Sequence, residues 1–390
     1  MKALLRKLDK PLLFFSLGMF IFGLVMIFSA SYVRAFVVAY NAYQYLIRQG
    51  LILIVCIFVF LVVISIPISF YKKLIYPILY GTIASLIAIF FFGTVINGAQ
   101  RWFNLGFFNF QPSEIAKTVI IVFMGVHYHK IRNNKDNYVL ALVPIIYVAI
   151  ISFLIFAQPD LGTTLIIFGI TALTFIAIPM NKKIKKRINL VVFSGLMVLC
   201  IAMGFAVLNG KQILTTTQIQ RFNFLKPCTR YMEAGTGYQV CNGYIAINNG
   251  GLFGVGIGNS TQKFLYLPEA HTDFIFPVIV EELGLIIGIL VILIYAFIIY
   301  RVLYISRKSS TLMGSIICYG IAMYIFMHVF VNLVGILGIL PLTGVPLPFL
   351  SYGGSFAINI TICLGLVQRV CIDTNRHTRE MTLRNKIKGR

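Results

Sequence analysis

Acidic residues are scarce in this chain. It holds 11 Asp and Glu against 33 Lys and Arg among 390 residues, and it has one Trp. Charged residues make up 11% of the chain, whereas soluble domains average about 25%. The hydrophobic fraction is 59% and the mean hydropathy is +0.90. These values exclude a soluble globular domain and predict an all-α polytopic membrane protein.

Several familiar chemical motifs are missing. The cysteines form no metal-type CxxC pair. His271 and Asp273 have no accompanying serine in a nucleophile elbow. The glycine-rich residues 250–258 lack a Lys-Ser/Thr ending, so a tight turn is favoured over a nucleotide site. The net charge of +22 does not indicate nucleic-acid binding, because the basic residues cluster in short loops between apolar runs.

About 20 apolar residues are needed to cross a bilayer core. The first apolar run follows a basic start and lacks a cleavage site, so we expect an uncleaved span. Glu114 and Lys117 make the fourth span the least apolar at its start. Ten spans are predicted, at residues 11–33, 44–68, 73–95, 113–131, 139–157, 160–180, 188–209, 272–300, 311–340 and 346–369.

The basic residues give the predicted orientation. With a cytoplasmic N-terminus, Lys and Arg favour the inner segments by roughly three to one, and the bias alternates through all ten spans. Both termini are then cytoplasmic. The chain is predicted to be a single membrane domain over 1–390, with a large outer loop at 210–271 and a basic cytoplasmic tail at 371–390. Cys228 and Cys241 share that loop, and a disulfide between them is left open.

Residues 263–276 are the most informative stretch. Lys263, Glu269, His271 and Asp273 lie directly before an apolar helix in a chain that has few acids. A charge at the edge of a bilayer is costly and rarely without function. We therefore expect the chemistry here, with Asp273 at its centre.

Other unusual polar residues gather on the predicted outer side. Glu114 and Lys117 share one helix face, either as a self-neutralising ion pair or as a lysine held ready for an anionic headgroup. Ser113 is a candidate N-cap for their helix. Asp160 precedes a helix, where a capping role competes with a functional one. Residues 342–355 form a Pro- and Gly-rich break that ends at Ser355, and such backbone is tolerated where it lines a wet cavity.

These segments together resemble the SEDS family of bacterial cell-wall proteins, which includes FtsW, RodA and SpoVE. The matching blocks occur in family order, and the spelling of residues 269–271 and the end of residues 23–31 are more similar to the FtsW branch. The blocks are residues 23–31, 101–102 with 111–117, 158–163, 267–276 with 281–284, and 346–349 with 351–355.

The resemblance implies a peptidoglycan glycosyltransferase that polymerises lipid II, the undecaprenyl-linked substrate, at the outer face of the bacterial cytoplasmic membrane. It implies a class B penicillin-binding protein as partner and, in the FtsW branch, a role at the division septum. The essential aspartate of the family falls on Asp273, and its important tryptophan falls on Trp102.

The implied chemistry suits these residues. A base must accept the proton of the attacking sugar hydroxyl, which is the expected role of Asp273, and the lipid diphosphate needs cations. The candidate substrate-binding residues are Arg101, Trp102, Glu114, Lys117, Asp160, Arg221, Lys263, Glu269, His271 and Ser355. The resemblance leaves room for a divalent cation, although the sequence shows no ligand cluster for one.

Two other functions compete with the polymerase. A lipid II flippase would need essential polar groups through to the inner face, whereas here they concentrate on the outer side, which favours the enzyme. A non-catalytic scaffold for the division or elongation machinery would need its helix faces but not Asp273.

Overall fold

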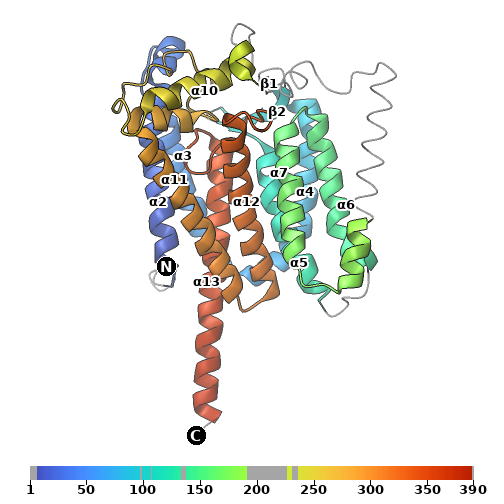
Figure 1. Ribbon diagram of the computed structural model, residues 1–390. Helices are drawn as coiled ribbons and strands as arrows, with labels where there is room; N and C mark the ends of the chain where they lie inside the picture. The colour runs from blue at the N-terminus through green and yellow to red at the C-terminus, as the bar shows by residue number, and fades with distance from the viewer. Residues whose placement is uncertain are drawn as a thin grey trace, which may run out of the picture.

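The structure is a computed structural model. It describes residues 7–96, 99–106, 108–132, 138–190, 226–230 and 236–388. Within these ranges the chain is a bundle of long helices (Figure 1). Seven of the described helices are long and apolar enough to cross a membrane, as a multi-pass membrane protein requires.

The helices follow the predicted spans closely. Helices α11 and α13 extend past the predicted ends at residues 300 and 369, whereas α12 ends before the predicted limit at residue 340. The predicted span at 188–209 lies almost wholly outside the described residues, as does Cys200. The membrane-length helices are α2 (Lys10–Ala39), α3 (Gln44–Ser65), α4 (Tyr71–Phe92), α6 (Tyr138–Ala157), α11 (Ile275–Lys308), α12 (Leu312–Ile336) and α13 (Gly354–Lys388).

Two further helices complete the described bundle. Helix α5 (Pro112–Lys130) is buried along nearly its whole length, so it faces protein rather than lipid, and polar residues in it have neighbours to bond. Its N-cap is Gln111 and not Ser113, whose hydroxyl is buried without a partner. Helix α7 (Leu161–Ala177) is shorter. The predicted cap is confirmed there, because the Asp160 side chain accepts from the Thr163 backbone N–H at 3.2 Å.

A small antiparallel sheet was not anticipated. It has the order β1 (Thr94–Ile96), β2 (Ala99–Asn104) and β3 (Asn109–Phe110), between α4 and α5. Hydropathy marks spans but gives no signal for such short strands in a loop. The sheet matters because Trp102 lies on β2, paired with Thr94, and Arg101 precedes it.

The predicted large loop contains ordered structure. The short helix η2 (Pro227–Arg230) precedes α10 (Thr236–Gly250), and a disulfide joins Cys228 to Cys241. This link closes the question that the sequence left open. Helix α10 lies across one end of the bundle, near β1 and β2 (Figure 1). The last part of α13 projects from the opposite end, where α2 also begins (Figure 1).

Helix α11 is interrupted close to its start. Gly284 has a φ of 86°, and a side chain there would meet the Leu252 carbonyl, so only glycine fits. Backbone bonds from Val255 and Gly256 to the carbonyls of Glu281 and Glu282 fill the break. The turn at residues 250–258 is therefore bonded to α11, the helix that follows Asp273. This bonding holds both ends of the segment from this turn to the start of α11.

Candidate active site

Two irregular segments interlock at the α10 end of the bundle: residues 267–274, before α11, and residues 342–353, before α13. The Ser351 hydroxyl donates to the Thr272 carbonyl at 2.6 Å, and the Tyr352 N–H donates to the His271 carbonyl at 2.9 Å. Non-helical backbone buried in a membrane protein has to be bonded in this way. Each segment therefore holds the other in place.

Asp273 lies where these segments meet, two residues before α11 begins. The Asn332 amide of α12 donates to its backbone carbonyl at 2.7 Å. Its carboxylate accepts from the Thr272 hydroxyl at 3.0 Å and passes close to Gly344, which adopts a left-handed φ of 68°. The side chain is 8% exposed, so it is held by protein yet reachable from the cavity described below.

Glu269 lies beside Asp273. The Thr272 hydroxyl is 2.8 Å from Glu269 Oε2, and its single proton serves one of the two carboxylates at a time. Arg34 of α2 lies 3.7 Å from Glu269 Oε1 and donates to the Pro268 carbonyl. An arginine thus balances one of the two neighbouring acids.

Glu114 and Lys117 form the expected ion pair in the first turns of α5. Lys117 Nζ lies 2.8 Å from Glu114 Oε1, and both side chains are almost completely buried. The ammonium is also 3.1 Å from His328 Nε2 of α12. Glu114 Oε2 is buried without a hydrogen-bond partner. Such a group is costly unless a ligand or water completes it.

Arg101 connects the small sheet to the start of α7. Its guanidinium donates to the Gln158 carbonyl at 3.0 Å and lies 3.5 Å from Asp160 Oδ1. The same guanidinium lies 6.0 Å from the ring centre of Trp102. Asp160 is therefore both a helix cap and the partner of Arg101.

Ser355 fixes the start of α13 against the sheet. Its hydroxyl accepts from the Gln111 N–H and donates to the Asn109 carbonyl, both at 2.9 Å. This residue supports the cavity wall where β3 leads into α5.

One cavity of about 540 Å³ brings most of the predicted residues together. A second cavity of about 400 Å³ shares Trp102 and Tyr352 with it and adds Arg48. Trp102 therefore lines both spaces, as a residue that contacts an extended ligand would. The predicted residues that line the larger cavity are Arg101, Trp102, Glu114, Lys117, Asp160, Glu269, Asp273 and Ser355.

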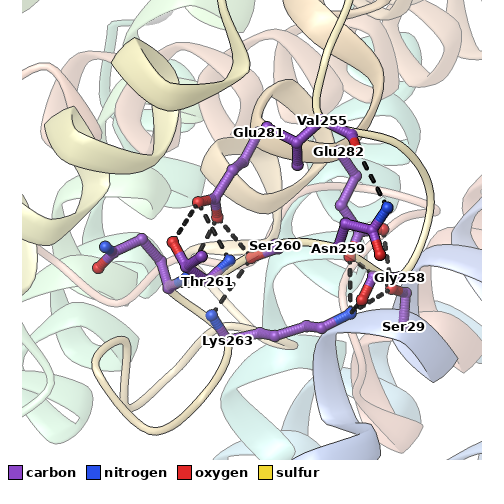
Figure 2. A network of polar contacts seen from close by, with 10 residues as sticks. Ser29, Val255, Gly258, Asn259, Ser260, Thr261, Lys263, Glu281 and Glu282 are labelled. Atoms are coloured by element: carbon purple, nitrogen blue, oxygen red, sulfur yellow. Dashed lines mark hydrogen bonds and ion pairs between the residues drawn. The ribbon is translucent and has the colours of Figure 1, made fainter.

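Lys263 is not brought to this cavity. Its ammonium is buried 2.9 Å from Glu282 and 3.2 Å from the Ser29 hydroxyl of α2 (Figure 2). Beside it, Glu281 accepts from Ser260 and Thr261 (Figure 2). This network connects the segment before Asp273 to α2 and α11. The prediction that Lys263 binds substrate in the cavity is therefore wrong, because its charge is already paired with Glu282.

We expect Lys263→Met to lower the free energy of unfolding by about 3–5 kcal/mol, because Glu282 would stay buried without its ammonium. The measurement is thermal unfolding of the purified protein. Lys263→Met with Glu282→Gln should recover most of the loss. Arg376→Met, which breaks the exposed pair with Glu380, should leave the unfolding midpoint nearly unchanged, because solvent screens an exposed ion pair. An unchanged Lys263→Met variant would contradict a stabilising role for the network.

His271 also lies outside the cavity. Its ring packs on Tyr45 and Tyr352, with centres 4.6 and 5.6 Å away. Burial, together with the nearby Arg34 charge, lowers the pKa of His271 to about 3. The imidazole is therefore neutral at physiological pH and serves as packing between the two interlocked segments.

This pKa gives a stability prediction. The unfolded chain binds a proton at His271 below about pH 6.5, whereas the folded chain does not bind it until about pH 3. The contribution of neutral His271 is complete above pH 6.5 and declines as the pH falls below it. Between pH 7.5 and 5.5 the loss should be about 1.4 kcal/mol. The drop in the unfolding midpoint from pH 7.5 to pH 5.5 should be larger in the wild type than in His271→Gln. An equal drop in both proteins would refute this prediction.

Arg221 lies outside the described residues. The cavity also contains Thr343 of the predicted break, and residues that the sequence did not mark, among them Gln239 of α10 and His328. His328 and Asn332 are polar residues one turn apart in a strongly apolar helix. Intramembrane polar residues of this kind mark function by default, and that signal would have found them.

The described residues do not suit a metal ion, since no group of three or more His, Cys, Asp or Glu side chains within them comes together to hold one. We therefore derive no step through a metal.

Comparison with known proteins places this geometry in a family. The family model described as "Cell cycle protein", which covers FtsW, RodA and SpoVE, matches residues 10–376. The chain belongs to this family. This match confirms the predicted family, and the relatives named next confirm the predicted likeness to FtsW.

Individual relatives agree with the family assignment. The probable peptidoglycan glycosyltransferase FtsW of Bacillus subtilis is 35% identical over 375 residues, covering 95% of this chain and 92% of that protein. The corresponding FtsW of Francisella salina is 34% identical, covering 93% and 89%.

Solved structures share the fold. A chain from a study of the structural coordination of polymerization and crosslinking by a peptidoglycan synthase complex superposes with a TM-score of 0.73 at 25% identity, covering 94% of this chain and 98% of that chain. The RodA of Thermus thermophilus gives a TM-score of 0.65 at 24% identity, covering 94% and 97%. The SEDS architecture therefore extends over nearly the whole chain.

Proposed function

We propose that this SEDS protein is a peptidoglycan glycosyltransferase that polymerises lipid II at the outer face of the cytoplasmic membrane. The observation that carries the proposal is the cavity of about 540 Å³ in which Asp273, Lys117, Arg101 and Trp102 meet. A carboxylate base, cations and an aromatic side chain in one cavity match the needs of sugar transfer from a lipid diphosphate. The name of the relatives, peptidoglycan glycosyltransferase FtsW, agrees.

The reaction forms one bond and breaks another. The 4-hydroxyl oxygen of the incoming lipid II attacks C1 of the terminal sugar on the growing chain. The bond from C1 to the diphosphate oxygen breaks, and undecaprenyl diphosphate leaves with the electron pair. The hydroxyl proton passes to the Asp273 carboxylate. A carboxylate is a weak base for a sugar hydroxyl, so its help is greatest late in the transfer, when the hydroxyl is most acidic.

The diphosphate of the substrate is proposed to bind the cations that line the cavity. Lys263 is already bound to Glu282, which leaves Arg101 and Lys117 among the described candidates that line the cavity. Arg101 is braced by Asp160 and two carbonyls, so it offers charge from a fixed position. Lys117 is the deeper of the two, and it pairs with Glu114, whose second carboxylate oxygen, Oε2, is buried without a hydrogen-bond partner.

The proposed setting follows the sequence. The predicted ten spans, cytoplasmic termini and outer loop at 210–271 support a cavity on the outer side, so in this proposal the α10 end of the bundle is extracellular. A class B penicillin-binding protein is the proposed partner, in keeping with the related chain from a synthase that couples polymerisation to crosslinking. The likeness to FtsW proteins supports work at the division septum.

The test is a polymerisation assay with the purified protein, its class B partner and labelled lipid II. We expect glycan chains that a muramidase degrades to disaccharide units. A parallel assay measures lipid II translocation across vesicles that contain the protein. Translocation without glycan chains would replace the polymerase with a flippase. Neither activity, with the complex intact, would favour a scaffold.

A further inference from the structure

Helix α12 carries two buried polar side chains, one turn apart, and the first of them, His328, lines the cavity. Asn332 donates through Nδ2 to the Asp273 carbonyl at 2.7 Å and to the Val345 carbonyl at 2.8 Å. His328, four residues earlier and fully buried, contacts Lys117 through Nε2 and the Pro346 carbonyl through Nδ1 at 3.2 Å. One turn of α12 thus bonds to Asp273, to Lys117 and to the carbonyls of Val345 and Pro346.

The partners of His328 fix where its proton lies. A carbonyl oxygen only accepts, so Nδ1 carries the hydrogen and donates to Pro346. A lysine ammonium only donates, so Nε2 has to be the acceptor. Both contacts are satisfied by a neutral imidazole in a single tautomer. A doubly protonated ring would instead place a second cation 3.1 Å from the Lys117 ammonium.

This arrangement holds the Lys117 ammonium from two sides. Glu114 takes one of its three N–H groups at 2.8 Å and His328 takes a second at 3.1 Å. The Tyr324 ring lies 5.7 Å from the same nitrogen. With Glu114 alone, the flexible lysine chain would be free to pivot about the carboxylate. With His328 as a second anchor, the remaining N–H has a defined direction for an anionic oxygen.

We propose that His328 is a positioning residue, which holds the Lys117 ammonium in place to bind the diphosphate of the lipid substrate. Because Asn332 fixes Asp273 from the next turn of the same helix, α12 sets the placement of the cation relative to the base. The inference rests on the proposed function for its ligand, a lipid diphosphate, and adds a residue that the sequence did not mark.

Two substitutions separate the two bonds of His328. In His328→Gln the amide oxygen reaches the position of Nε2 and accepts from Lys117. In His328→Asn the amide nitrogen reaches only the position of Nδ1, so the Pro346 bond survives and the Lys117 bond is lost. The readout is binding of undecaprenyl diphosphate to the purified full-length protein. We expect His328→Gln to bind within about threefold of the wild type and His328→Asn to bind at least about tenfold more weakly.

A double substitution distinguishes positioning from general damage to the fold. If His328 acts through Lys117, His328→Asn added to Lys117→Met weakens binding no further. The matched control is His127 of α5, a second buried histidine whose Nε2 lies 2.8 Å from the Leu140 carbonyl and which does not line the cavity. His127→Gln and His127→Asn should both bind like the wild type.

Three results would overturn the inference: equal binding by His328→Gln and His328→Asn, an equal loss from His328→Asn with and without Lys117, or no binding of undecaprenyl diphosphate by the wild type. The polymerase proposal fails separately. A wild type that binds undecaprenyl diphosphate but forms no glycan removes that activity, while the comparison of the two variants still decides the role of His328.

Discussion

Replacing Asp273 with asparagine is expected to lower the initial rate of glycan formation by at least about 100-fold. The amide keeps the size of the side chain and can still accept from the Thr272 hydroxyl, which lies 3.0 Å from Oδ1. The backbone bond from Asn332 does not depend on the side chain. The substitution therefore removes the group that accepts the hydroxyl proton and leaves the cavity wall in place.

The measurement is consumption of labelled lipid II by the purified complex with the class B partner. Thermal unfolding midpoints of the variant and the wild type should agree within a few degrees. Glu380→Gln removes an acid from the exposed tail of α13 and should polymerise like the wild type. Full activity of Asp273→Asn in an intact complex would remove Asp273 from the chemistry.

Replacing Lys117 with methionine is expected to lower the rate by about 100- to 1,000-fold. The ammonium is the deepest cation among the described residues that line the cavity, and in the proposed mechanism it stabilises the charge that develops on the departing diphosphate. The substitution also costs about 3–5 kcal/mol of folding free energy, because Glu114 is left buried and uncompensated. The two effects need to be separated.

The double variant Glu114→Gln with Lys117→Met separates them. It replaces the ion pair with neutral groups of similar size, and we expect most of the folding stability to return while polymerisation stays low. Unfolding midpoints and lipid II consumption are measured on the same preparations. Recovery of polymerisation together with stability would assign the pair to the fold alone.

The spans, and the candidates Asp273, Glu114 and Lys117 that line one cavity, were predictable from local signals in the sequence. Apolar runs of membrane length have few alternatives to a spanning helix, and an acid at the membrane edge persists where it has a use. Asp273, Glu114 and Lys117 stood out against an apolar background and lie around one cavity. The Asp160 cap was equally local, because it depends on residues within one turn.

Long-range pairing was not predictable. Lys263 was expected to bind substrate because it lies close to Asp273 in the sequence. In the structure it pairs instead with Glu282 and contacts Ser29, which lies 234 positions away. His328 carries no formal charge and was interpreted as part of a span, because nothing in the sequence brings α12 next to α5. The strands around Trp102 were missed, because the few residues of each give no periodic signal.

The most direct test of the account is a structure of the complex with an unreactive lipid II analogue. We predict the analogue in the cavity between Trp102 and Asp273, with its diphosphate against Lys117 and a sugar hydroxyl within hydrogen-bond reach of the Asp273 carboxylate. An analogue bound elsewhere, with this cavity empty, would contradict the assignment of the active site.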